Sequence, residues 1–373
     1  MNIILLGATG SIGSLSLELI ESYNYTLLGV SLGSDIDKSV SIVKKFNPKY
    51  ICIRKEENKA FFNFFKGDIY AGDEGLKKLA SIKCDILINA LSGSAGLIPM
   101  MDAINAHNDI ALANKESLVM AGNIIMKEAK KKGINIYPVD SEHNALWQCL
   151  KGENMDDVNM LYITASGGAL RDKKYEELEN VTVSEALSHP NWKMCKKITI
   201  DSATMMNKGF EVIEAHHLFN IPYRKIKPIM HKESTVHALV LFNDSNIKAV
   251  ISPHDMKLPI LYAINRGSRI EYNNNLKLTT LHFKNLSNKR YPLLKVAIDA
   301  GKKGGIMPTI LSAANEAAVN LFLAGKIKFL DIEKIIKAEL DKAINFNPTI
   351  EDIIRVDKEV KERILGGNLS WYL

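Results

Sequence analysis

The chain has 373 residues, of which 46% are hydrophobic and 24% are charged. This length predicts two or three domains, and the composition excludes collagen-like, low-complexity and intrinsically disordered proteins. The formal net charge is +6, but the lysines are scattered and form no long basic run. We therefore expect no nucleic-acid-binding arm and a lysine-rich solvated surface, while a basic pocket for an anionic substrate remains open.

The four cysteines, Cys52, Cys84, Cys149 and Cys195, lie far apart and form no Cys-x-x-Cys pair. This spacing argues against a disulfide framework, a zinc ribbon or a redox motif. The first residues do not resemble a signal peptide, and no apolar run approaches the roughly 18 residues that would cross a membrane. We expect a cytoplasmic protein with reduced thiols and no membrane association.

Short apolar runs alternate with helical periods up to about residue 140. The expected strands are 3–6, 26–32, 50–53, 86–90, 110–113 and 134–137, and the first expected helix is 12–20. Alternation of this kind predicts an α/β fold with a mostly parallel, doubly wound sheet. We interpret 1–140 as a dinucleotide-binding domain.

The pattern changes after residue 140. Further strands are expected at 161–164, 198–200, 237–242 and 248–251, with helices between them, so 141–265 is interpreted as a catalytic α/β domain. The Asn- and Lys-rich stretch 266–295 predicts a linker with some strand content. Helical periods at 295–300, 310–324 and 332–344 then predict a small helical domain over 296–373.

A glycine-rich run lies between the first strand and the first helix. Gly7, Gly10 and Gly13 stand three residues apart, in the context where glycines permit close approach of a pyrophosphate and the helix N-terminus supplies N–H donors. A glycine-rich turn without a ligand is the less favoured alternative. Asp35 follows the second strand, where an acidic residue accepts from a ribose 2′-hydroxyl, so NADH is not excluded.

Polar residues also follow two later strands, at the edge where α/β sheets bind ligands. The run Asn-Lys-Glu-Ser at 114–117, taken alone, is best explained by a helix with Asn114 as its N-cap. Asp140 and Glu142 would share a face in an extended segment, and two carboxylates about 7 Å apart repel unless a cation or proton lies between them. These two acids fit a metal site and a solvated turn equally well.

Three further segments could bind a ligand. A helix is expected to begin near 202–204 and to present Asn207, Lys208 and Glu211 on one face, although an ordinary Lys–Glu surface pair would have the same spacing. The loop Ala-Ser-Gly-Gly at 165–168 follows a strand and suits phosphate binding. The loop 189–194 carries Trp192, which is either a packing anchor or part of a lid over a ligand.

Several of these runs together resemble one family, 1-deoxy-D-xylulose 5-phosphate reductoisomerase. They are NKESLV at 114–119, PVDSEHNA at 138–145, ASGG at 165–168, HPNW at 189–192, DSATMMNKG at 201–209 and ANEAAV at 314–319. The runs keep the family order over nearly the whole chain. The resemblance implies a Rossmann-like dinucleotide-binding domain, a central α/β catalytic domain and a C-terminal helical bundle, in a homodimer formed largely through the catalytic domains.

The resemblance also implies an activity. The family converts 1-deoxy-D-xylulose 5-phosphate into 2-C-methyl-D-erythritol 4-phosphate with hydride from NADPH, in the non-mevalonate route to isoprenoid precursors. A divalent cation, Mg²⁺ or Mn²⁺, is held in the family by the equivalents of Asp140, Glu142 and Glu211. Three hard oxygen ligands suit these ions, so the resemblance decides between the metal site and the solvated turn.

The remaining site residues are assigned by their match to family positions. Substrate-binding positions are matched by Lys115, Ser141, Glu142, Ser166, His189, Trp192, Ser202, Asn207, Lys208, Glu211, His237 and Met256. Cofactor-binding positions are matched by Gly7, Thr9, Gly10, Ser11, Ile12, Gly33, Asn114, Glu116 and Cys195. Lys115, Glu142 and Lys208 are expected to take part in catalysis, the two lysines by offsetting negative charge.

Two positions depart from the family. Family members often carry a basic residue and Asn after the glycine that ends the second strand, whereas Gly33 is followed here by Ser34 and Asp35. We still expect NADPH, with weaker discrimination against NADH, because like charges would face each other. Cys195 stands where many relatives have Gly, so a backbone contact to the cofactor there is expected to differ.

Two other classes of protein are less favoured. A metal-free two-domain dehydrogenase, such as a semialdehyde dehydrogenase, would need a nucleophilic cysteine, and none of the four lies in a convincing motif with a paired histidine. If the chain were a nucleotide-binding module that had lost catalysis, some of its acidic site residues would be expected to be missing. Asp140, Glu142 and Glu211 are all present.

Overall fold

The computed structural model describes residues 1–192, 194–277, 280–367 and 372, and it divides into two compact units. Unit 1 comprises Met1–Ser117, Ile124–Asn144 and Asp255–Asn273. Unit 2 comprises Leu118–Asn123, Ala145–His254 and Asn274–Leu373. Two helices, α5 (Lys115–Lys132) and α6 (Ser141–Leu150), contribute residues to both units.

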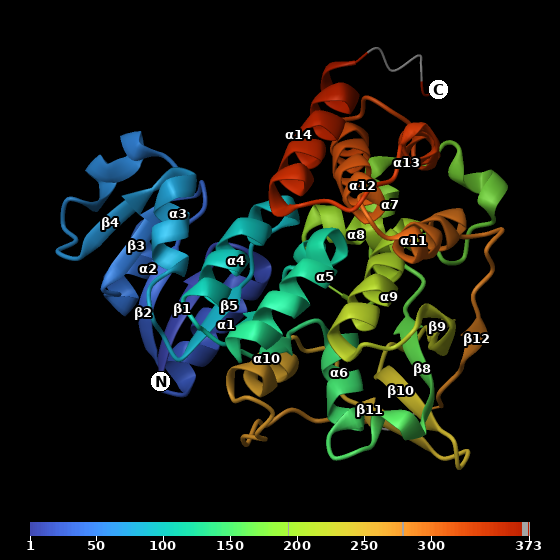
Figure 1. Ribbon diagram of the computed structural model, residues 1–373, viewed down its shortest axis with the longest axis horizontal. Coiled ribbons are helices and arrows are strands. Elements are labelled where there is room, and N and C mark those ends of the chain that lie inside the picture. The colour runs from blue at the N-terminus through green and yellow to red at the C-terminus, as the bar shows by residue number, and fades with distance from the viewer. Residues whose placement is uncertain (193, 278–279, 368–371, 373) are drawn as a thin grey trace. The chain divides into compact units, whose positions relative to one another are not determined.

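Unit 1, which is described throughout, is built on a seven-stranded parallel sheet in the order β4-β3-β2-β1-β5-β6-β7. Figure 1 labels the strands β1 to β5 of this sheet. Its strands are β1 (Asn2–Leu6), β2 (Thr26–Ser31), β3 (Tyr50–Ile53), β4 (Asp68–Ala71), β5 (Ile86–Asn89), β6 (Ile110–Leu112) and β7 (Ile136–Pro138). Strands of a parallel sheet are buried on both faces and therefore form continuous apolar runs, as in β1, where 3–6 are all inaccessible to solvent. The predicted doubly wound sheet is confirmed, and β4 is an additional edge strand.

The strand order places a ligand crevice at β1. The chain adds β2, β3 and β4 on one side of β1 and β5, β6 and β7 on the other, so the order reverses between β1 and β5. Open α/β sheets bind ligands at this switch point, beyond the carboxyl ends of the strands. The helices of this unit, apart from α5 and the start of α6, are α1 (Ser11–Ser22), α2 (Ile36–Phe46), α3 (Gly72–Ala80), α4 (Leu97–Asn105) and α10 (Lys257–Ile264), with short 3-10 turns at Glu56–Phe62 and Gly93–Gly96.

Helix α10 returns to unit 1 from much later in the chain. Its Ile260, Leu261 and Ile264 belong to the same buried cluster as Leu17 of α1. The domain boundaries expected from the sequence instead divide the segment Asp255–Asn273 between the catalytic domain and the linker. Local periodicity identifies the helix but carries no information about which sheet it covers, because that depends on contacts between residues more than 200 positions apart, such as Tyr25 with Asn265.

Unit 2 contains, among its described residues, a five-stranded mixed sheet in the order β11-β10-β8-β9-β12. The strands are β8 (Val158–Ala165), β9 (Ile226–Met230), β10 (Val236–Phe242), β11 (Ile247–Ile251) and β12 (Lys284–Asn285). One face packs through Leu161, Ile163 and Val240 into a core that Leu146 of α6 and Val212 of α9 (Met206–Phe219) share. The other face carries half-buried apolar side chains of β8 and β10.

The C-terminal helices form a bundle around α12. They are α11 (Pro292–Lys303), α12 (Met307–Leu323), α13 (Asp331–Lys342) and α14 (Ile350–Gly366), and α12 packs against both α13 and α14 (Figure 1). Helix α12 is apolar on nearly all sides, which is typical of a helix at the centre of a bundle. The predicted helical region is confirmed, with α14 as an additional helix. Among the described residues, no helix combines the length and apolar character needed to span a membrane.

Three local expectations are wrong. The helix expected to begin near 202–204 begins at Met206, because Ser202 and Thr204 belong to the preceding helix. Residues 198–200 lie inside helix α8 (Lys196–Thr204) rather than in a strand. The β-branched run Ile198-Thr199-Ile200 favours a strand locally, but Thr199 and Ile200 are buried in the helical conformation and packing outweighs propensity. The segment after β7 is also not extended: helix α6 begins at Ser141, so Glu142 lies in its first helical turn.

Two backbone features in unit 2 position the loop after β8 against the junction of α8 and α9. Met205, between these helices, has a left-handed conformation with φ +64°, which turns the chain sharply so that α9 starts at once. Gly168 has φ +72°, and a Cβ atom there would lie 2.7 Å from Ala203 Cα and from the Ser202 carbonyl oxygen. The loop therefore touches α8 backbone to backbone, which a side chain at 168 would prevent.

We expect Gly168→Ala to destabilise the protein more than Gly152→Ala does. Both glycines are left-handed, but Gly152 has open space around its missing Cβ. The control should cost about 1 kcal/mol from backbone strain alone, and Gly168→Ala should cost about 1–3 kcal/mol more from the clash. Thermal unfolding followed by circular dichroism measures both. Equal losses in the two variants would show that the contact with α8 is unimportant.

Candidate active site

The glycine-rich run of unit 1 forms a bare backbone turn at the start of α1. Gly7 has φ +85°, and a Cβ there would lie 2.5 Å from the Ala90 carbonyl oxygen after β5. A Cβ at Gly13 would lie 2.2 Å from the Gly7 oxygen. Gly10 is the N-cap of α1 and has no side chain to bond the first N–H groups of the helix, which include those of Ser11 and Ile12. Such a turn fits a pyrophosphate.

The start of α5 confirms the N-cap interpretation of Asn114. Its Oδ1 accepts from the Ser117 N–H at 3.1 Å, while its Nδ2 donates to the carbonyl oxygens of Leu91 and Gly93 at 2.9 and 2.8 Å. The same Nδ2 donates to Glu116 Oε2 at 3.3 Å. These bonds hold α5 against the loop after β5, beside the switch point of the sheet. The cofactor-binding role of Asn114 and Glu116 stays a prediction.

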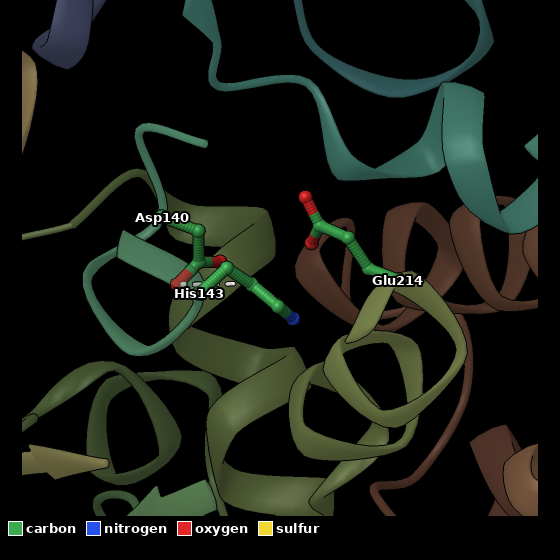
Figure 2. A group of neighbouring side chains, drawn as sticks. All are labelled: Asp140, His143 and Glu214. Carbon is green, nitrogen blue, oxygen red and sulfur yellow. Dashed lines mark ion pairs between the residues drawn. The ribbon is translucent and has the colours of Figure 1, made fainter. Parts of the chain in front are cut away.

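The end of β7 presents a carboxylate to two basic groups of unit 1. Lys115 Nζ forms a close ion pair with Asp140 Oδ2, and His143 Nδ1 lies 3.9 Å from Asp140 Oδ1, the contact drawn as a dashed line in Figure 2. Burial raises the pKa of Asp140, but the Lys115 ammonium, His143 and hydrogen bonds outweigh it and hold that pKa well below its usual range. Asp140 is therefore ionised at neutral pH and suited to bind a cation.

Two neighbours of Asp140 complete this cluster. Ser141 Oγ donates to Glu142 Oε2 at 2.5 Å, at the N-terminus of α6, where negative charge is favoured by the helix dipole. His143 is fully buried and was missed by the sequence analysis, although it lies in the quoted run at 138–145. His143 follows Asp140 by three residues, and in a helix this spacing places two side chains on one face. The spacing could therefore have identified His143.

In unit 2, His189 ties the lid loop to the loop after β8. Its Nδ1 accepts from the backbone N–H groups of Asn191 at 3.2 Å and Trp192 at 3.0 Å, and its Nε2 lies 3.0 Å from Ser166 Oγ. Burial, with help from Arg171 and His254, lowers the pKa of His189 to about 4. A neutral imidazole with an accepting Nδ1 is assigned the Nε2–H tautomer. It therefore donates to Ser166, whose own hydroxyl hydrogen can point to a ligand.

Arg171 supports the same loop. It donates through Nη1 to the carbonyl oxygens of Ser166 at 3.0 Å and Lys232 at 3.1 Å. Gly167, with φ +92°, lies directly against the Arg171 Cβ position and Met230. Sequence reasoning missed Arg171 because a single arginine after a glycine pair has no motif of its own.

Helix α9 buries a pair of opposite charges. Lys208 Nζ donates to Glu211 Oε2 and Asn207 Nδ2 donates to Glu211 Oε1, and the residues Lys208 and Glu211 are only 4% and 1% exposed. These values exclude the surface-pair alternative. A buried carboxylate needs a partner, and here an ammonium and an amide satisfy one oxygen each.

Ser202 is positioned through its neighbour Asp201. The Asp201 carboxylate is 1% exposed, accepts from Asn315 Nδ2 at 2.8 Å and pairs with Lys197 Nζ at 2.7 Å. Asn315 belongs to the ANEAAV run on α12, so this motif anchors the helical bundle to α8. The sequence analysis assigned no role to the run, because its partner lies 114 residues away.

The ring of Trp192 packs against the rings of two histidines of the same unit. Its ring is 5.3 Å from that of His254 and 6.1 Å, edge-on, from that of His237 on β10. The lid predicted at 189–194 includes Lys193, which lies outside the described residues. Cys195 is the N-cap of α8, and Met256 is the N-cap of α10 in unit 1.

The proposed site residues thus fall into two groups, each brought together by its own unit. Unit 1 supplies the glycine turn and the cluster around Asp140, and unit 2 supplies the loop after β8, the lid and the polar face of α9. Members of the substrate set in unit 1 are Lys115, Ser141, Glu142 and Met256. Members in unit 2 are Ser166, His189, Trp192, Ser202, Asn207, Lys208, Glu211 and His237.

Comparison with known proteins gives a consistent result. The family model described as 1-deoxy-D-xylulose 5-phosphate reductoisomerase matches residues 3–122, and the two models for its C-terminal domain match 136–219 and 251–363. The reductoisomerase of Clostridium kluyveri is 46% identical over 97% of this chain and 98% of that protein. Reductoisomerase 2 of Bacillus thuringiensis subsp. konkukian is 43% identical over 98% and 99%.

Solved structures agree. The reductoisomerase of Zymomonas mobilis in complex with NADPH is 37% identical and superposes with a TM-score of 0.90 over 98% of both chains. A DOX-P reductoisomerase in complex with NADPH, fosmidomycin and magnesium has a TM-score of 0.92 at 37% identity, again over 98% of both chains. The chain described here belongs to the 1-deoxy-D-xylulose 5-phosphate reductoisomerase family.

Proposed function

We propose that this chain converts 1-deoxy-D-xylulose 5-phosphate into 2-C-methyl-D-erythritol 4-phosphate with hydride from NADPH, as a step of non-mevalonate isoprenoid precursor synthesis. The observation that carries the proposal is that the chain keeps the carboxylate set Asp140, Glu142 and Glu211 within a family match that covers nearly its whole length. The solved relatives with NADPH and magnesium support the same cofactors for this chain.

The cation site is proposed to consist of Asp140, Glu142 and Glu211. Three carboxylates offer hard oxygen ligands, which Mg²⁺ and Mn²⁺ prefer. When bound, the cation supplies Lewis-acid chemistry, polarising the substrate carbonyl and stabilising an adjacent alkoxide or enolate. Two of these acids, Asp140 and Glu211, are paired here with Lys115 and Lys208, so ammonium groups balance their charge in the form described.

Lys115 and Lys208 are also proposed to interact with the substrate. With a cation held by Asp140 and Glu211, the Lys115 and Lys208 ammonium groups would be able to face negative charge on the substrate. Lys115 would offset charge near the oxygen-bearing end of the sugar, and Lys208 would offset charge near its phosphate. NADPH, held at the turn of Gly7, Thr9 and Gly10, would supply the hydride for the reductive half of the reaction.

The phosphate is proposed to bind among Ser166, Ser202, Asn207 and Lys208. Neutral His189 donates to Ser166 Oγ and so directs the hydroxyl hydrogen of Ser166 away from itself, towards a phosphate oxygen. The same imidazole holds the backbone of the lid at Trp192. Phosphate binding and lid position are thereby coupled through one ring, and a lid excludes water from the reaction.

A homodimer is proposed to form through the open face of the unit 2 sheet. Cross-strand pairing places Met160, Tyr162, Leu239, Leu241 and Ile247 on the face away from the core. The first four are half-buried and Ile247 is 54% exposed. A contiguous apolar sheet face of this kind is typical of an association surface. A cytoplasmic location is proposed with it, in keeping with four free cysteines.

The proposed reaction is tested by following loss of reduced cofactor on addition of 1-deoxy-D-xylulose 5-phosphate, NADPH and Mg²⁺ or Mn²⁺. Substrate-dependent oxidation that disappears on chelation of the metal is the expected result. Oxidation that needs no sugar phosphate would contradict the proposal.

Substitution of the proposed metal ligands should lower activity while leaving the fold intact. Asp140→Asn, Glu142→Gln and Glu211→Gln each remove one negative ligand, so each should raise the Mg²⁺ concentration needed for half-maximal rate by about tenfold or more. The matched control is Glu362→Gln on the exposed surface of α14. Rates across a Mg²⁺ titration, with circular dichroism for the fold, measure the effect. Three variants with the wild-type titration curve would place the cation elsewhere.

The lid should respond to pH through His189. Because its pKa is lowered in the folded loop, the neutral form is favoured above the ordinary pKa of about 6.5, and this stabilisation is lost as pH falls towards about 4. The emission of Trp192, taken as the difference between the chain and its Trp192→Phe variant, should change over this range. His189→Asn keeps an acceptor for the backbone but cannot take up the proton, so the change should vanish. An identical pH profile in His189→Asn would assign the effect to another group.

The dimer should depend on the open sheet face. Leu239→Lys puts a charge at its centre, next to Tyr162 and Ala249, and should yield a monomer because burying an unpaired ammonium is unfavourable. Ile354→Lys, at an exposed apolar position of α14, is the control and should stay dimeric. Light scattering of each purified chain decides. Loss of the dimer in both variants, or in neither, would exclude this face.

A further inference from the structure

The turn after β2 contains no basic residue, but the helix that follows it, α2, carries Lys38 in its first turn. Asp35 is the N-cap of α2, and its Oδ1 accepts from the backbone N–H of Lys38 at 3.0 Å. Its carbonyl oxygen also accepts from the Ser39 hydroxyl at 2.6 Å. The Asp35 carboxylate is therefore engaged with the first turn of α2, a structural role that the sequence analysis did not assign to it.

The Lys38 side chain turns back onto the glycine-rich turn of unit 1. Its Nζ donates to the Thr9 carbonyl oxygen and to Ser14 Oγ, both at 2.8 Å. An ammonium group has three N–H donors, and these two contacts use two of them. The third donor and the full positive charge are available to an anionic ligand at this half-buried position.

This ammonium lies between two parts of a dinucleotide site. The pyrophosphate of a dinucleotide lies on the turn that contains Thr9, and its adenosine ribose lies beyond the end of β2. These two places adjoin here, because a Cβ at Gly33 would lie 2.2 Å from Thr9 Oγ1. A cation bonded to Thr9 therefore stands beside the ribose, where NADPH carries a 2′-phosphate and NADH does not.

We propose that Lys38 binds the 2′-phosphate and selects NADPH over NADH in this chain. The inference rests on the proposed function, since it takes a nicotinamide cofactor as given. Ser34 stands where the family is usually basic, and the cation comes instead from the first turn of the helix that Asp35 caps.

The test compares direct binding of NADPH and NADH to the full chain, measured by the fluorescence of the reduced nicotinamide. Lys38→Met should raise the Kd of NADPH about tenfold, the effect expected for loss of one charged contact, and change that of NADH less than about twofold. Lys38→Arg should restore the preference. Lys45→Met, on the last turn of the same helix and ion-paired with Glu21, should change neither. Adenosine 2′,5′-bisphosphate and adenosine 5′-monophosphate as competitors should show the same contrast without the nicotinamide.

Three outcomes would overturn the proposal. Equal weakening of both cofactors in Lys38→Met would mean that Lys38 only supports the glycine-rich turn. Unchanged binding of both would mean that the cation makes no contact. A wild-type chain that binds neither cofactor would overturn the proposed function as well, and it is distinguished from the first two because the failure precedes any substitution.

Asp35→Asn gives an independent check. Asparagine is as good an N-cap as aspartate, so α2 should keep its start while one negative charge disappears. The Kd of NADPH should fall more than that of NADH. A change of equal size in both would show that the Asp35 charge does not reach the ribose.

Discussion

The need to partner buried charge governs the candidate site residues of each unit. On α9, Lys208 and Glu211 are almost completely buried, and each would be strongly unfavourable without the other. At the end of β7, Asp140 is held ionised by Lys115 in the same way. Each pair places an ammonium group beside a carboxylate, and at Asp140 the ammonium of Lys115 helps to hold the pKa of that carboxyl below its usual range. The candidate residues therefore carry both signs of charge, as the proposed cation and sugar phosphate would require.

Backbone conformations that side chains disfavour place these charges. Gly7 and Gly13 let the β1–α1 turn pack directly against the backbone of Ala90 and against itself, which leaves the N–H groups at the start of α1 bare. In unit 2, Gly168 lets the loop after β8 contact α8, while Met205 accepts a left-handed conformation so that α9 begins immediately. The polar face of α9 and the loop after β8 are therefore fixed by a few special backbone positions rather than by flexible connections.

Single side chains connect parts of the site that are distant in sequence. His189 uses one ring nitrogen to hold the lid backbone and the other to orient Ser166. Asn315 of the helical bundle holds Asp201, next to Ser202, and Lys38 of α2 reaches the turn before α1. These contacts tie the loop after β8, the loop of His189 and the glycine-rich turn to elements that are distant in sequence.

The sequence by itself determined much of this protein. Apolar runs separated by helical periods specify the parallel sheet, because both faces of each strand must be buried, and the glycine spacing specifies the turn at its switch point. The family runs predict which acids, amides and lysines form the candidate site. These features are local, and a local signal is present in the sequence before any fold exists.

Only the tertiary structure decided the rest. It made 198–200 a helix against their propensity, returned α10 to unit 1, buried Lys208 with Glu211, and turned Asp35 into a cap beside Lys38. Each outcome depends on partners that are remote in sequence or on burial, which periodicity does not encode. The identity of the reacting groups is thus a property of the sequence, whereas their pairing and protonation are properties of the folded chain.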